Sequence, residues 1–178
     1  MSEKKDVYAE AKKQMRLGER IVAAIPGFRG YKEKELRRES DKLIRNHLHR
    51  KLSESKHYLK SVFQKLSDRR YFDVITDMDR LMAKVDRITE KVNHASYGYS
   101  GFFDIVKVKE ENLDRMIDFD NKLVDAADGL AADVDVFKAE IAKGETKNVK
   151  EKIQEIADKM EAFEETFDKR TEVMLGVT

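Results

Sequence analysis

The sequence predicts an all-α protein, an antiparallel bundle of four to five long helices with coiled-coil-like packing, in a single domain over residues 1–178. Apolar residues recur in alternating steps of three and four over most of the chain, which is the spacing of one helix face. Charged residues make up 40% of the chain, against about 25% in an ordinary globular domain. One proline and eight glycines leave few turn residues. High charge alone is also typical of disordered chains, but the regular apolar spacing argues against disorder.

The first helix is expected over residues 5–25, where small and apolar residues form one stripe at helical spacing. Pro26 and Gly27 end it, because the residue before a proline is driven out of the helical conformation. The second helix is expected over residues 31–66. Its stripe consists of Ile44, Leu48, Leu52, Ser55, Leu59, Val62 and Leu66. We therefore expect Pro26, Gly27 and Gly30 to form a hinge between two helices.

Three further helices are expected over residues 71–94, 102–143 and 146–175, each with an apolar stripe in steps of three and four. Residues 102–108, FFDIVKV, are ambiguous because their β-branched residues also suit an extended segment. A lone strand has nothing to pair with, so we interpret this segment as helix or as a hydrophobic lead-in. Gly144 is well placed to end the helix before it.

Charge is divided unevenly along the chain, although the net charge is only +1. Residues 1–70 hold 20 lysines and arginines against 10 acids, whereas residues 71–178 hold 16 against 25. Two halves of opposite charge attract each other within one bundle. Alternatively, the basic half meets an anionic partner.

Several classes of protein are disfavoured by composition. The chain has no cysteine, so disulfides, thiolate catalysis and cysteine metal sites are excluded. The first residues lack the apolar core of a signal peptide, and no window approaches the roughly 18 apolar residues of a membrane span. We expect a soluble, cytoplasmic protein without a transmembrane segment.

Catalytic and metal-binding patterns are sparse. A di-metal site in a helical bundle needs two Glu-x-x-His motifs, and only Glu54 and His57 have that spacing. The stripe of the second helix turns both of them away from the core. His47 and His49 point to different faces of a helix and are expected at the surface. We predict no catalytic residue, no metal site and no cofactor.

Two polar residues lie on apolar stripes, Asp120 on the fourth helix and Arg170 on the last. A buried polar group costs about 1–3 kcal/mol unless it is paired, so each is expected to have a partner or to lie near an end. A contact that sets the helix register is the favoured interpretation, and a ligand site is the alternative.

The basic segment, residues 28–60, carries 11 lysines and arginines against five acids. Its candidate anion-binding residues are Arg29, Lys32, Arg37 and Arg38, with Phe28 and Tyr31 beside them to stack on a base or enter a lipid interface. The backbone amides at a helix N-terminus also favour anions.

The opposing interpretation is a solvated charged face. Glu33, Glu35, Glu39 and Asp41 are interleaved with the bases, as on a long exposed helix. Phe28 and Tyr31 then plug the end of the bundle. This interpretation is favoured over anion binding.

These observations favour a non-catalytic interaction or scaffold protein that acts through protein partners or as a homo-oligomer. The first alternative is electrostatic binding of nucleic acid or an anionic membrane surface through the basic segment. The second is a ferritin-like metal-dependent enzyme, for which the histidines are too few.

Overall fold

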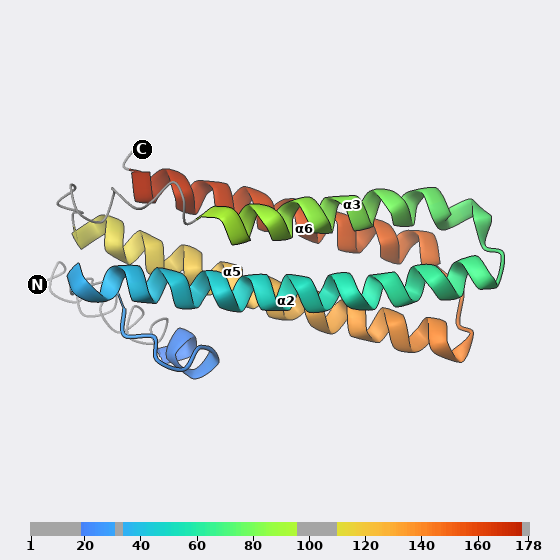
Figure 1. Ribbon diagram of the computed structural model, residues 1–178, viewed down its shortest axis with the longest axis horizontal. Helices are drawn as coiled ribbons and strands as arrows, with labels where there is room; N and C mark the ends of the chain where they lie inside the picture. The colour runs from blue at the N-terminus through green and yellow to red at the C-terminus, as the bar shows by residue number, and fades with distance from the viewer. Residues whose placement is uncertain (1–18, 31–33, 96–109, 176–178) are drawn as a thin grey trace, which may run out of the picture. The chain divides into compact units, whose positions relative to one another are not determined.

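The computed structural model describes residues 19–30, 34–95 and 110–175, and these residues are almost entirely helical (Figure 1). Residues 19–24 form a helical segment. The long helices are α2 (Lys34–Asp68), α3 (Phe72–His94), α5 (Glu110–Lys143) and α6 (Val149–Leu175). The prediction of an all-α helical bundle is therefore confirmed. The ambiguous residues 102–108 lie outside the described part of the chain.

The chain divides into two compact units. Unit 1 comprises Met1–His47, Ser96–Val124 and Thr166–Thr178, and unit 2 comprises Leu48–Ala95 and Asp125–Glu165. Helices α2, α5 and α6 contribute residues to both units, whereas α3 belongs to unit 2. A single folding domain stays a prediction.

The core of unit 2 is built from the apolar stripes that the sequence spacing predicted. Every helix of the unit supplies side chains that are at most 4% exposed. Representative members are Leu52, Leu59, Val62 and Leu66 of α2, Met78, Leu81, Val85 and Ile88 of α3, Leu130, Val134, Phe137 and Ile141 of α5, and Ile153, Ile156, Met160 and Phe163 of α6. Burial of these stripes supplies the main driving force for folding.

Ion pairs define which helices are neighbours in unit 2. Lys56 of α2 pairs with Asp86 of α3. Nζ of Lys51 in α2 lies 3.4 Å from Oδ1 of Asp128 in α5. Lys84 of α3 pairs with Glu161 of α6, and Lys159 of α6 pairs with Asp133 of α5. The order around the unit is therefore α2, α3, α6, α5, which is a four-helix bundle.

Glu164 of α6 contacts two cations of α3. Its carboxylate accepts hydrogen bonds from the guanidinium of Arg87 and, at 3.0 Å, from the ammonium of Lys91, both in α3. The hydrogen bonds from Arg87 and the hydrogen bond from Lys91 lower the pKa of Glu164 from 4.5 to about 2. Partial burial of the carboxyl opposes this shift.

The α2–α3 and α5–α6 connections of unit 2, residues 67–72 and 143–148, are together called the loop end. Helix α2 ends in a Schellman motif: the Tyr71 N–H donates to the Leu66 carbonyl at 3.0 Å, and the Arg70 N–H donates to the Ser67 carbonyl at 2.9 Å. This motif places Arg70 in the left-handed region, with φ of 61°. Glycine usually occupies that position, so an arginine there is strained.

Helix α5 ends in the same motif at Gly144, as the sequence predicted. The Gly144 N–H donates to the Ile141 carbonyl at 3.2 Å, and the Glu145 N–H donates to the Glu140 carbonyl at 3.0 Å. Gly144 has φ of 87°, a conformation without strain for glycine. The two motifs thus differ in one respect, since only α2 has a side chain at the left-handed position.

Side chains join the two connections. Arg69 donates from Nη1 to the Ile141 carbonyl at 2.6 Å, so a cation caps the C-terminus of α5. The Tyr71 hydroxyl donates to Oγ1 of Thr146 at 3.0 Å. The loop end is therefore cross-linked by hydrogen bonds.

Unit 1 has its own apolar core. Its buried side chains come from the N-terminal segment and from α2, α5 and α6: Ile21, Ile25, Phe28, Ile44, Met116, Leu123, Phe167, Val173 and Met174. In the described residues, none of the helices has the length and hydropathy needed to cross a membrane.

Candidate functional site

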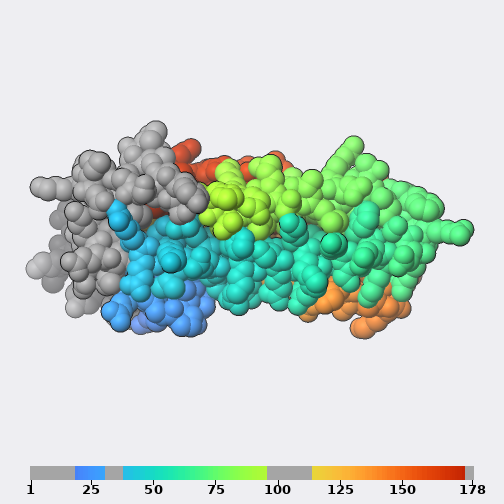
Figure 2. All heavy atoms as spheres, in the orientation of Figure 1, coloured from blue at the N-terminus to red at the C-terminus, as the bar shows by residue number. Residues whose placement is uncertain are grey.

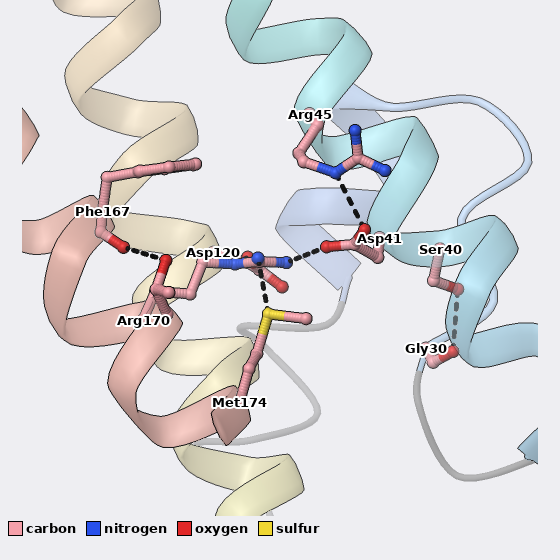
Figure 3. A network of polar contacts seen from close by, with 9 residues as sticks. Gly30, Ser40, Asp41, Arg45, Asp120, Phe167, Arg170 and Met174 are labelled. Carbon is pink, nitrogen blue, oxygen red and sulfur yellow. Dashed lines mark hydrogen bonds and ion pairs between the residues drawn. The ribbon is translucent and has the colours of Figure 1, made fainter. Parts of the chain in front are cut away.

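Four charged residues from three helices form the buried charge cluster of unit 1: Asp41 and Arg45 of α2, Asp120 of α5 and Arg170 of α6 (Figure 3). Arg170 donates from Nε to Asp120 Oδ1 at 2.5 Å and from Nη2 to Asp41 Oδ1 at 3.0 Å. The other oxygen of Asp41 accepts a hydrogen bond from Arg45 Nε at 2.8 Å. Arg170 and Asp120 are fully buried, and the side chain of Asp41 is only 3% exposed.

Helical spacing explains why these side chains meet. Asp120 and Arg170 replace apolar residues on their stripes, so each points into the core, and the prediction that each has a partner is confirmed. Asp41 precedes Ile44 by three residues and therefore lies on the stripe of α2 as well. The sequence reasoning missed this residue and placed it on a solvated face, which is wrong.

The composition of the cluster points to a structural role. Its two carboxylates balance the charge of its two guanidiniums. Arg170 also donates from Nη1 to the sulfur of Met174, at an N···S distance of 2.9 Å. No buried side-chain nitrogen or oxygen among the described residues lacks a hydrogen-bond partner. We interpret this fully satisfied cluster as a contact that sets the relative register of the helices that supply it.

The N-terminal side of the basic segment forms a turn in unit 1. The Phe28 N–H donates to the Ile25 carbonyl at 3.2 Å, and Gly27 and Gly30 have φ of 88° and 84°. The Ser40 hydroxyl donates to the Gly30 carbonyl at 2.8 Å, which holds the turn against α2 (Figure 3). A turn thus lies where the hinge was expected, while a hinge role of Pro26, Gly27 and Gly30 stays a prediction.

The candidate anion-binding residues are placed unequally. Phe28 is 5% exposed, so its ring belongs to the core and offers no face to a base or a lipid. Arg29 and Arg38 are exposed. Tyr31 and Lys32 lie outside the described residues. The backbone of Arg37 lies in α2, but its side chain is not described. Anion binding by this segment stays a prediction.

One histidine that was predicted at the surface is buried. His47 is only 7% exposed, so the prediction that it lies at the surface is wrong. His57 is exposed. The Glu54 carboxylate accepts a hydrogen bond from the Tyr58 hydroxyl, and this hydrogen bond raises the pKa of Tyr58. Within the described ranges, no three His, Cys, Asp or Glu side chains are grouped so that they could hold a metal ion.

The outer face of α5 in unit 2 carries small and apolar residues at its centre. It consists of Asp125, Gly129, Ala132, Val136, Ala139 and Lys143, all exposed and spaced by alternating steps of four and three. Val136 is 56% exposed. Beside it lies a groove of about 120 Å³ whose lining includes Val136, Phe137 and Ile156.

No family model, curated protein or solved structure matches this chain.

Proposed function

We propose that this chain is a non-catalytic helical-bundle protein that works by self-association, with the outer face of α5 as the contact. The observation that carries the proposal is the spacing of that face. Its central residues are small or apolar and exposed, and a charged residue of opposite sign stands at each end, Asp125 and Lys143.

Two copies of this face bring opposite charges together only when the two α5 helices run antiparallel. A two-fold axis near position 134 places Asp125 opposite Lys143 of a second copy, Gly129 opposite Ala139, and Ala132 opposite Val136. Small residues allow two helix backbones to approach closely, and attraction at both ends favours the antiparallel register. A parallel pair would oppose like charges at both ends.

Charges beside the face are compatible with this contact. Asp133 pairs with Lys159 at 2.6 Å, and Asp135 lies 3.9 Å from Lys138, so each acid near the axis has a cation of its own chain. The contact is about 27 Å long at a rise of about 1.5 Å per residue. A contact along one helix face of that length is small beside the roughly 1,600 Å² of surface that a standard interface buries. We therefore expect weak, concentration-dependent association.

Sedimentation equilibrium over a wide range of protein concentration tests the proposal. Ala132→Glu places a bulky charge at the centre of the contact and should weaken association by more than tenfold. Ala142→Glu is the matched control, because residue 142 is also exposed on α5 but lies away from the outer face. Equal effects of the two variants would contradict the proposed contact.

Charge reversal tests the register. Asp125→Lys alone and Lys143→Asp alone should each weaken association, because each creates like-charge contacts at both ends of the pair. The double variant exchanges the two signs and should restore association. A chain that stays monomeric at millimolar concentration would remove self-association as the function.

A further inference from the structure

The loop end of unit 2 combines an exposed aromatic side chain with basic residues, of which only Lys143 also belongs to the α5 contact. Phe72 is 68% exposed, and it is the one aromatic side chain among the described residues that falls in the exposed class. Figure 2 shows the α2–α3 connection, in green at the right of the view, uncovered on the face presented.

The exposure of Phe72 occurs on a rigid frame. Tyr71, its neighbour in the chain, is tied to Thr146, and Arg69 is tied to the C-terminal carbonyls of α5. Phe72 is itself the first residue of α3. These bonds hold the backbone that leads into Phe72.

The surroundings of Phe72 carry an excess of positive charge. Within residues 67–73 and 143–148, which include the residue after Phe72, there are four cations, Arg69, Arg70, Lys143 and Lys147, and three acids, Asp68, Asp73 and Glu145. All seven are exposed. Arg70 stands at a left-handed position where glycine would be relaxed, so a cation is held there at a conformational cost.

An anionic bilayer surface offers a match for both features. Its phosphate groups attract lysine and arginine, and an apolar layer lies directly beneath them for an aromatic ring. Duplex nucleic acid offers phosphates without such a layer, and single-stranded nucleic acid, whose bases can stack on an aromatic ring, is the competitor that the test includes. We infer that the loop end of unit 2 binds an anionic lipid surface peripherally, with Phe72 in the interface and Arg70 and Lys147 against headgroup phosphates.

The absence of tryptophan from the chain allows a direct test. In Phe72→Trp the sole tryptophan reports its own environment. With phosphatidylserine-containing vesicles at low salt, its emission should shift to shorter wavelength and be quenched by brominated lipid. Ala83→Trp, exposed on the same helix but away from the loop end, is the matched control and should stay unchanged. Protein is kept dilute, so that the result does not depend on self-association.

The opposite results are equally defined. An unshifted spectrum at saturating anionic lipid overturns the inference, as does an equal shift of Ala83→Trp. A shift with single-stranded DNA but not with vesicles overturns it in favour of nucleic acid.

A second variant measures the electrostatic part. Arg70→Gly removes a charge while relaxing the backbone, so weaker binding cannot result from unfolding. We expect about fivefold weaker vesicle binding by co-sedimentation, and a further weakening of similar size when Lys147→Gln is added. Unchanged binding of the double variant would contradict the role of these cations.

Discussion

Replacing Arg170 by methionine tests the interpretation that the buried charge cluster sets the register of unit 1. The substitution keeps an unbranched apolar stem and removes the guanidinium. Asp120 then loses the hydrogen bond from Arg170 at a fully buried site, and Asp41 loses one of its two arginine partners. The change removes a positive charge from beside two buried carboxylates.

The magnitude follows from these contacts. Each hydrogen bond to a charged group contributes about 1.5–3 kcal/mol, and removing one partner of a buried ion pair costs about 3–5 kcal/mol. Because Asp41 keeps Arg45, we expect a loss of about 4 kcal/mol in the free energy of unfolding. For a chain of this length, that loss lowers the Tm by roughly 8–16 °C.

Urea and thermal unfolding followed by circular dichroism measure the loss. Lys169→Met is the matched control, since Lys169 is exposed on the same helix, and we expect a change within about 0.5 kcal/mol. A loss of less than about 1 kcal/mol for Arg170→Met would refute the reasoning. In a double-mutant cycle with Asp120→Asn, the two changes should be strongly non-additive, because they remove the same contact.

Two further predictions concern unit 2. Arg70→Gly should raise the free energy of unfolding by about 1 kcal/mol, because it relaxes a left-handed residue, whereas Gly144→Ala should lower it by a similar amount; opposite signs in urea unfolding are the test. Glu164 has a folded pKa below its unfolded value, so its stabilisation is complete above pH 4.5 and is lost as pH falls towards 2. Glu164→Gln should therefore destabilise by about 1 kcal/mol at pH 7 and by only a small part of that near pH 2, where the folded carboxyl is half protonated. A difference independent of pH would contradict this cause.

Local spacing was sufficient to predict most of the helical architecture. The stripes predicted a third helix over 71–94 and a last one over 146–175, and the structure has them at Phe72–His94 and Val149–Leu175. Gly144 ends α5 as expected, because a glycine after a helical stripe suits the left-handed position of a helix end. These features depend on a few consecutive residues, so the sequence carries them directly.

The loop end shows where local reasoning stops. Arg70 occupies the same position as Gly144 in its motif, yet an arginine gives no local signal for left-handed backbone. The bonds from Arg69 to the Ile141 carbonyl and from Tyr71 to Thr146 join residues more than 70 positions apart. Such contacts exist only once the helices have packed.

What the sequence by itself determined is which residues face inward: the apolar stripes, and with them Asp120 and Arg170, because helical periodicity fixes the face on which a residue lies. Only the tertiary structure decided that Asp41, rather than another of the interleaved acids, joins Arg170 and Asp120. The physical reason is axial register. A stripe says which side of a helix is buried, but the side chains that meet across the core depend on how far each helix is shifted along its neighbours, and that shift is set by the packing of the whole core.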